Sequence, residues 1–345
     1  MPDVQEVFRM ATEKVRQDPG ALDRQVTKQH KVQRNRRIGA FATVLVLIAV
    51  VAGIYALSHS GTREVPAHPS SPVQIAPGAT SGTMVDLSTG SVTALPAKLA
   101  SVAATYYAMS PDQGRIAYSV CCNKPSPLYV SNADGTHVHV VSRPGWDAFG
   151  AQWSPDGSML VYQQRHQESL HLGDLIIVVP GRPNERTQIT HLDRSPRWGW
   201  WFMFPSFSAD GRSVLFQMPR GDGNEWDLWS VPVTGGQPTI VRRDVGWGAY
   251  SPDGMSLAYI APMDQSFSGE KLWIAPLSGG SPVAVATGHL SWARWSPDGT
   301  KISYSGGDGY VHVFDLASGK NTRIALGQNA EWADDHTLIV GYGGT

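Results

Sequence analysis

The chain has 345 residues, 41% of them hydrophobic and 17% charged, with a formal net charge of −1 at pH 7. This is the composition of an ordinary globular protein, and its 36 glycines and 24 prolines indicate many tight turns. The charge is divided unevenly, because residues 1–37 carry a net +4 and the rest a net −5. The acidity of the larger part argues against nucleic-acid binding there, so no nucleic-acid partner is expected.

Residues 1–37 form a basic and amphipathic segment. Val4, Phe8, Ala11 and Val15 recur at helical spacing, which predicts a short amphipathic helix over residues 3–17. Five Lys and Arg residues then crowd between positions 28 and 37. We interpret this basic run as a topological signal beside anionic lipid headgroups rather than as a nucleic-acid site.

Residues 38–57 predict a transmembrane helix. The segment has twenty residues without a charge, and at helical rise it spans about 30 Å, the thickness of the hydrocarbon core. A cleaved signal peptide is the alternative, but its apolar region would be shorter and no Ala-x-Ala site follows. Basic residues precede the segment, so the positive-inside rule predicts a single-pass protein of the cytoplasmic membrane with a cytoplasmic N-terminus. Membrane lipid is therefore one expected partner, and the rest of the chain is expected outside the cytoplasm.

Beyond a Pro/Ser/Gly-rich linker at residues 58–82, residues 83–345 contain a string that recurs six times. Its clearest copy runs from Trp295 to Tyr304: an aromatic residue, Ser-Pro-Asp-Gly, and an alternating apolar strand. Pro and Gly at those positions suit a tight turn, and Ser and Asp can bond the local backbone, so each copy predicts a β-hairpin. The turn serine or its equivalent stands at Ser110, Ser154, Ser208, Ser251, Ser296 and Ala333.

The spacing of the copies, 37 to 54 residues, is typical of propeller blades with four strands each. A second hairpin is expected after each of the first five copies, near residues 127–141, 175–190, 227–241, 271–285 and 310–324. The sixth copy, about 328–342, is expected to pair with residues 83–96. We therefore predict an all-β fold, a six-bladed β-propeller closed by its N- and C-terminal strands and preceded by one transmembrane helix.

The repeated string resembles the TolB-type propeller repeat, a relative of the WD repeat, over roughly residues 83–342. The resemblance implies the fold and no single function, because such repeats serve binding modules, peptidase side domains and cell-envelope proteins. TolB carries an α/β domain before its propeller, where this chain has the predicted membrane segment. The partners of TolB are therefore not carried over.

Aromatic residues in the loops that enter the first strands are the predicted binding surface. Exposed Trp and Arg anchor large rigid areas and are enriched at binding sites, and a sugar can stack on such rings. The alternative is that these rings pack between blades. The predicted partner-binding residues are Trp146, Arg197, Trp198, Trp200, Trp201, Trp247 and Trp292.

Two further candidates are weaker. Cys121 and Cys122 are the only cysteines, and both a vicinal disulfide and two free thiols are compatible with this pair. His137 and His139, two apart on an expected strand, lack further ligands at recognisable spacing, so neither a metal nor a cofactor is expected.

The leading function is recognition: a membrane-anchored extracytoplasmic propeller acting as a scaffold or sensor that binds an envelope protein or glycan. No Gly-x-Ser-x-Gly or His-Glu-x-x-His motif occurs, and the chain is predicted not to be an enzyme. The alternative function is a lactonase- or lyase-like propeller enzyme with its site in the central channel. A third is a pure spacer, which would bury the Trp loops.

Overall fold

The Ser-Pro-Asp-Gly copies fold as the hairpins that their turn chemistry predicts, and the fold is known here from a computed structural model. The structure describes residues 82–100, 106–119, 125–166, 173–192, 203–220, 225–261 and 269–341. The predicted segment 1–37, the predicted membrane helix 38–57 and the linker up to residue 81 lie outside these ranges. Within them, no helix is long and apolar enough to cross a membrane.

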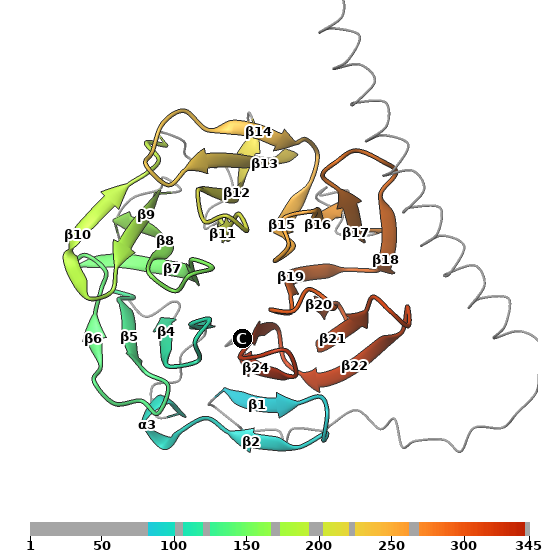
Figure 1. Cartoon of the computed structure of the whole chain (residues 1–345), viewed down its shortest axis with the longest axis horizontal. Coiled ribbons are helices and arrows are strands. Elements are labelled where there is room, and N and C mark those ends of the chain that lie inside the picture. Colours follow the sequence, from blue (N-terminus) through green and yellow to red (C-terminus); the bar gives the residue numbers. More distant parts are fainter. Residues whose placement is uncertain are drawn as a thin grey trace, which may run out of the picture. The chain divides into compact units, whose positions relative to one another are not determined.

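Six four-stranded antiparallel sheets surround a central axis (Figure 1). We number these blades from 1 to 6, and in blades 1–5 the strands follow chain order, from the centre outward. Blade 1 holds β3 (Tyr106–Met109), β4 (Arg115–Ser119), β5 (Leu128–Asn132) and β6 (His139–Val140), and blade 2 holds β7 (Trp146–Trp153), β8 (Leu160–His166), β9 (Asp174–Val179) and β10 (Arg182–Gln188). Blade 3 holds β11 (Ser206–Phe207), β12 (Ser213–Arg220), β13 (Glu225–Pro232) and β14 (Thr239–Arg242). Blade 4 holds β15 (Gly246–Tyr250), β16 (Ser256–Ala261), β17 (Lys271–Pro276) and β18 (Val283–Thr287), and blade 5 holds β19 (Leu290–Trp295), β20 (Lys301–Gly306), β21 (Tyr310–Asp315) and β22 (Asn321–Leu326).

Blade 6 joins the two ends of the propeller. Its strand order is β2 (Val92–Ala94), β1 (Thr83–Asp86), β24 (Thr337–Gly341) and β23 (Asn329–Trp332). The register across the closure pairs Thr83 with Val340 and Val85 with Leu338. The prediction that the ring closes with strands from both ends of the repeat region is confirmed. One element was not foreseen, a single helical turn, α3 (Ala97–Ala100), between blades 6 and 1.

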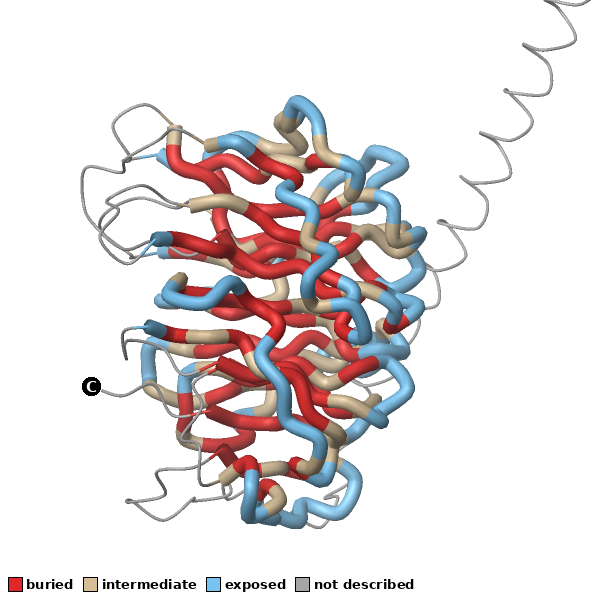
Figure 2. The backbone as a smooth tube through the Cα atoms, turned by 90° about the vertical axis from the view of Figure 1, so that its left-hand side faces the viewer, coloured by how far each residue is buried: buried red, intermediate tan, exposed pale blue. Residues whose placement is uncertain are grey.

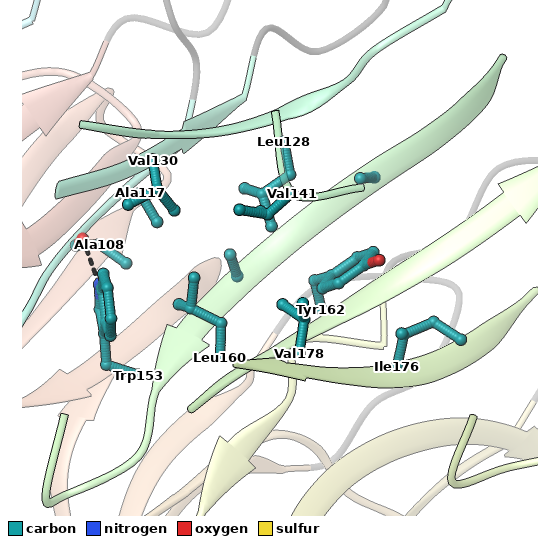
Figure 3. Packing of buried hydrophobic residues seen from close by; sticks show 12 residues of the cluster. Ala108, Ala117, Leu128, Val130, Val141, Trp153, Leu160, Tyr162, Ile176 and Val178 are labelled. Carbon is teal, nitrogen blue, oxygen red and sulfur yellow. Dashed lines mark hydrogen bonds between the residues drawn. The ribbon is translucent and has the colours of Figure 1, made fainter. Parts of the chain in front are cut away.

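The tryptophan before a turn serine ties its blade to the preceding one. The indole N–H of Trp153 in blade 2 donates to the Ala108 carbonyl of blade 1 at 2.9 Å, the bond drawn in Figure 3. Trp295 reaches the Ala249 carbonyl at 3.1 Å and Trp332 reaches the Arg294 carbonyl at 3.1 Å, each again one blade back. These rings therefore pack in the cores between sheets, as the repeat predicts.

Apolar side chains from adjacent sheets fill the spaces between blades. In the core between blades 1 and 2, Leu128, Leu160 and Tyr162 are fully buried (Figure 3). Figure 2 shows the same division along every blade, with buried residues through the strand centres and exposed residues gathered in the turns. Such continuous packing makes the inner strands a rigid frame for the side chains that face the central channel.

Candidate functional site

Two positions of the repeat line the central channel. The polar layer consists of the residues two places before each turn serine or its equivalent, and the aromatic layer of those four places before it. The polar layer is Ala108, Gln152, Ser206, Ala249, Arg294 and Glu331. The aromatic layer is Tyr106, Gly150, Phe204, Trp247, Trp292 and Asn329. The polar layer lines one cavity, and most residues of the aromatic layer line another.

Glu331 is the centre of the polar layer. Three donors from three other chain positions converge on its Oε1: Gln152 Nε2 at 3.1 Å, Trp292 Nε1 at 3.2 Å and Arg294 Nε at 3.0 Å. The Arg294–Glu331 ion pair lies across the boundary between blades 5 and 6, and both side chains are nearly buried. Burial raises the pKa of the Glu331 carboxyl, while the Arg294 guanidinium and the other donors oppose that shift.

A cavity of about 480 Å³ lies on the turn side of the polar layer. Its wall includes the Ser-Pro segments of the turns and its floor includes Gln152, Arg294 and Glu331. Exposed rim residues such as Pro111 and Gln113 show that it opens at the end where the turns lie. This volume is within the range of small-molecule sites.

The aromatic layer closes the other side of the channel. The Phe204 ring lies 3.9 Å from that of Trp247 and 4.7 Å, edge-on, from that of Trp292, and Tyr106 stacks on Trp292 at 5.2 Å. Trp292 is 3% exposed, whereas Trp247 is half-buried. A cavity of about 350 Å³ adjoins these rings and is also lined by His289, Ser291 and Gln328 among others.

The backbone of this layer is unusual. Phe204, Trp247 and Trp292 have φ of +43°, +49° and +58°, the left-handed region that large side chains rarely adopt. Gly150 occupies the same repeat position in blade 2 with φ +60°, where a glycine adopts it without steric cost. The pairing register shifts next to three of these residues, at Phe149/Gln152, Gly246/Ala249 and Ser291/Arg294. Each of these first strands therefore bulges at the aromatic layer.

The predicted binding residues separate into three groups. Trp247 and Trp292 lie together at one cavity, 5.9 Å apart between ring centroids. Trp146, half-buried, instead meets His166 edge-on at 5.2 Å and lies under the Arg143 guanidinium. The remaining predicted residues, Arg197, Trp198, Trp200, Trp201, Cys121 and Cys122, lie outside the described residues.

The histidine pair does not share a strand. His137 has φ +54° and precedes β6, which begins at His139. Its Nδ1 contacts Asn132 Nδ2 at 2.9 Å. Across the described part of the chain, no group of three or more His, Cys, Asp or Glu side chains could hold a metal ion.

Sequence reasoning missed the polar layer. The signal was the position two before the turn serine, where most copies carry a small or uncharged residue but two carry Arg294 and Glu331. Opposite charges at the same repeat position of two copies indicate an ion pair between the two blades. The hint becomes usable only once blades 5 and 6 are known to be neighbours through ring closure.

The comparisons with known proteins bear on the fold. No family model and no curated protein matches this sequence. Among solved structures, a putative TolB from Agrobacterium tumefaciens is similar with TM-score 0.59 and 16% identity, covering 77% of this chain and 98% of that one. TolB from Acinetobacter baumannii is similar with TM-score 0.54 and 14% identity, covering 76% of this chain and 64% of that one. The chain therefore spans less than two thirds of the Acinetobacter protein, and these likenesses show a TolB-like six-bladed fold.

The prediction that the chain is not an enzyme is wrong. A Kuenenia stuttgartiensis hydrazine synthase chain is similar with TM-score 0.51 and 13% identity, covering 82% of this chain and 96% of that one. Proteins with this fold thus include one named as an enzyme, the hydrazine synthase, and others that are not, the TolB proteins. The lack of familiar catalytic motifs in this sequence is no ground for excluding catalysis.

Proposed function

We propose that this chain is a membrane-anchored recognition protein whose propeller, held outside the cytoplasm by residues 38–57, binds an envelope protein or glycan at the aromatic layer. The TolB-like fold supports a binding role without specifying the ligand. The uncharged twenty-residue stretch and the basic residues before it support the anchor and its orientation. The acidity of the rest of the chain supports a ligand other than nucleic acid.

The observation that carries the proposal is the left-handed backbone of three aromatic residues around one cavity. A bulky residue in that region costs on the order of 1–3 kcal/mol. Glycine would remove that cost and does stand at the equivalent place in blade 2. Ring stacking returns about 0.5–1.5 kcal/mol for a pair. Trp247 is half-buried, and its ring stacks on Phe204 and also lines a cavity. We attribute its left-handed conformation to a ligand that fills this cavity.

The cavity chemistry fits a glycan or a peptide. One wall is aromatic, and the others present an imidazole, a hydroxyl and amide groups from His289, Ser291 and Gln328. Flat rings accept the apolar face of a sugar or a side chain, and the surrounding polar groups fix its orientation. Among the Tyr, Phe and Trp residues of the lining, Trp247 is the most exposed.

The test is Trp247→Gly in the full chain, purified in detergent. Glycine relieves the positive φ, which offsets part of the lost packing, so the thermal stability should change little. Binding should fall at least tenfold. It is measured by tryptophan-fluorescence titration with soluble envelope glycan fragments, and by photocrosslinking of envelope proteins from a reactive residue placed at Ser291. Trp273→Ala is the matched control, because Trp273 is a half-buried tryptophan on β17 of the same blade, away from this cavity. Equal binding by both variants, or none by the wild type in either arm, would refute the proposal.

One observation favours the second candidate, an enzyme working in the channel. Glu331 is buried, has a raised pKa and lines a cavity beside a guanidinium, which are features of acid/base residues. Incubation of envelope fractions with the wild type and with Glu331→Gln, followed by mass spectrometry, distinguishes the two functions. Products released only by the wild type would favour catalysis, while equal product patterns with retained binding favour recognition.

A further inference from the structure

Arg294, whose guanidinium lies 5.0 Å over the Trp292 ring, has one donor without a hydrogen-bond acceptor among the described residues. Its side chain is 8% exposed and lines the turn-end cavity. The Nε atom donates to Glu331 and Nη1 donates to the Ala293 carbonyl at 3.1 Å. Nη2 is buried and has no hydrogen-bond partner among the described residues. A buried charged donor without an acceptor is costly, so an acceptor is expected from something that enters the cavity.

Glu331 offers the complementary group. All three of its donors meet on Oε1, and no described residue donates to Oε2. Glu331 lines the same cavity as Arg294. The two paired residues of the floor therefore hold a buried donor without an acceptor and a carboxylate oxygen without a described donor. At about 480 Å³ the cavity holds far more than the single water that could bridge them, since a water occupies about 30 Å³.

The charge around the cavity selects an uncharged ligand. Arg294 is the only Lys or Arg in the described lining, and Glu331 already neutralises it. Asp334 and Asp335 are the other acidic residues of the described lining, and they make the wall of the cavity negative. An anionic ligand would meet this negative wall and would leave the buried site with a net charge.

We propose that the turn-end cavity binds a ligand through a carboxamide group, whose carbonyl oxygen accepts from Arg294 Nη2 and whose N–H donates to Glu331 Oε2. A carboxamide carries one acceptor and one donor side by side without a charge, and that is the pattern the floor lacks. Two sources supply this chemistry, a peptide and an N-acetylated amino sugar. This site is on the opposite side of the polar layer from the Trp247 cavity, so its test is independent of the function proposed above.

The experiment titrates the full chain, in a detergent without sugar or amide groups, with three probes by calorimetry. The probes are the N-acetylglucosamine dimer, the blocked dipeptide N-acetyl-Ala-Ala-amide, and sodium acetate as an anion. We expect at least one amide probe to bind more tightly than acetate. Binding of the sugar alone or of the peptide alone identifies the source, and both results support the site.

Three variants connect that binding to the floor. Arg294→Lys keeps the positive charge beside Glu331 but lacks the Nη2 donor, and it should weaken the amide probe at least tenfold. Ser206→Leu fills the cavity from blade 3 without touching the ion pair, and it should do the same if Arg294→Lys fails to fold. Gln237→Ala, an exposed residue between β13 and β14 that lies outside the cavity lining, is the matched control and should leave the affinity within twofold.

The contrary results are equally definite. If neither amide probe binds the wild type at millimolar concentration, the proposal is overturned. Acetate binding more tightly than both amides would make this an anion site instead. Undiminished amide binding by folded Arg294→Lys and Ser206→Leu would move the ligand elsewhere. Loss of probe binding by Trp247→Gly but not by Ser206→Leu would assign it to the aromatic layer.

Discussion

At the scale of single residues, the turn serine organises each hairpin with its hydroxyl group. In blade 4, Ser251 Oγ donates to Asp253 Oδ1 at 2.5 Å and accepts from the backbone N–H of Ser256 at 2.8 Å. The same pair of bonds recurs around Ser154, Ser208 and Ser296. The hydrogen bond from Ser251, followed by that from the Met255 N–H, lowers the pKa of Asp253.

Ser251→Ala should destabilise the fold by about 1–2 kcal/mol, because it leaves the half-buried Ser256 N–H without its acceptor. It should also raise the pKa of Asp253 toward its ordinary value of 3.8. Urea unfolding measures the first effect and carbon-detected NMR titration the second. Ser278→Ala, at an exposed turn, is the control and should change neither.

The pH dependence of that variant has a definite sign. A carboxyl whose folded-state pKa is lowered stabilises the fold above its unfolded pKa, and this contribution is lost as pH falls through the folded value. The deficit of Ser251→Ala relative to wild type should therefore be larger at pH 7 than below pH 3. A deficit that is constant with pH would show that the serine acts only on the backbone.

The polar layer could not be predicted from the local sequence around its residues. Arg294 and Glu331 look like unrelated single charges, 37 positions apart. Their pairing depends on which blades are neighbours, and their burial depends on the aromatic rings on one side of them. Neither property is local, so neither can be obtained from the residues around each charge.

At the scale of strands and blades, the indole-to-carbonyl bond joins adjacent sheets. Trp332 is 7% exposed and donates to the Arg294 carbonyl. This bond joins β23 of blade 6 to β19 of blade 5, the strand that carries Arg294 of the polar layer. Its ring also packs in the core formed by blades 5 and 6. One side chain thus serves both the interface and the alignment of the channel wall.

Trp332→Phe should lower the free energy of unfolding by about 1–3 kcal/mol, because it removes the stronger of two side-chain hydrogen bonds to the Arg294 carbonyl, the other coming from Ser303 Oγ at 3.4 Å, and leaves a small void. Trp273→Phe is the control, since the indole of Trp273 bonds within its own blade, to Ala261 at 3.3 Å, and is half-buried. Guanidinium unfolding compares the two. An equal loss in both variants would mean that the bond between blades contributes nothing beyond ring volume.

Hairpins are well predicted from this sequence and bulges are not. Turn chemistry and alternation are local, so all six first hairpins and the five following ones were placed correctly. The bulges beside Trp247 and Trp292 recur beside Gly150, so they belong to the repeat position and not to the side chain that stands there. Whether such rings pack between blades or enter the channel depends on their neighbours, which explains why Trp146 and Trp247 differ.

At the scale of the whole propeller, the ring depends on β1 pairing with β24. Val85 is 1% exposed and lies opposite both Val92 and Leu338, so it is bonded into the middle of blade 6. Leu338 is fully buried in the core between blades 5 and 6. The closing strand therefore contributes core packing as well as backbone pairing.

Val85→Pro should open this closure, because proline removes a ladder donor in a central strand. We expect amide hydrogen exchange in β24 to quicken more than tenfold, while β12 and β13 of blade 3 stay protected. Val283→Pro, on the exposed outermost strand β18, is the control and should affect only blade 4. Unchanged exchange in β24 would contradict a closure made by β1.

Ring closure has a consequence for biosynthesis. The partner of β1 is almost the last segment of the propeller to be made, so a nascent chain carries β1 and β2 without their neighbour while five blades are added. During that time the blade 6 edge is open to pairing with other chains. A cell that makes this protein must shield the edge until the final hairpin arrives, so ribosome stalling or a late frameshift should produce aggregates rather than a shorter working ring.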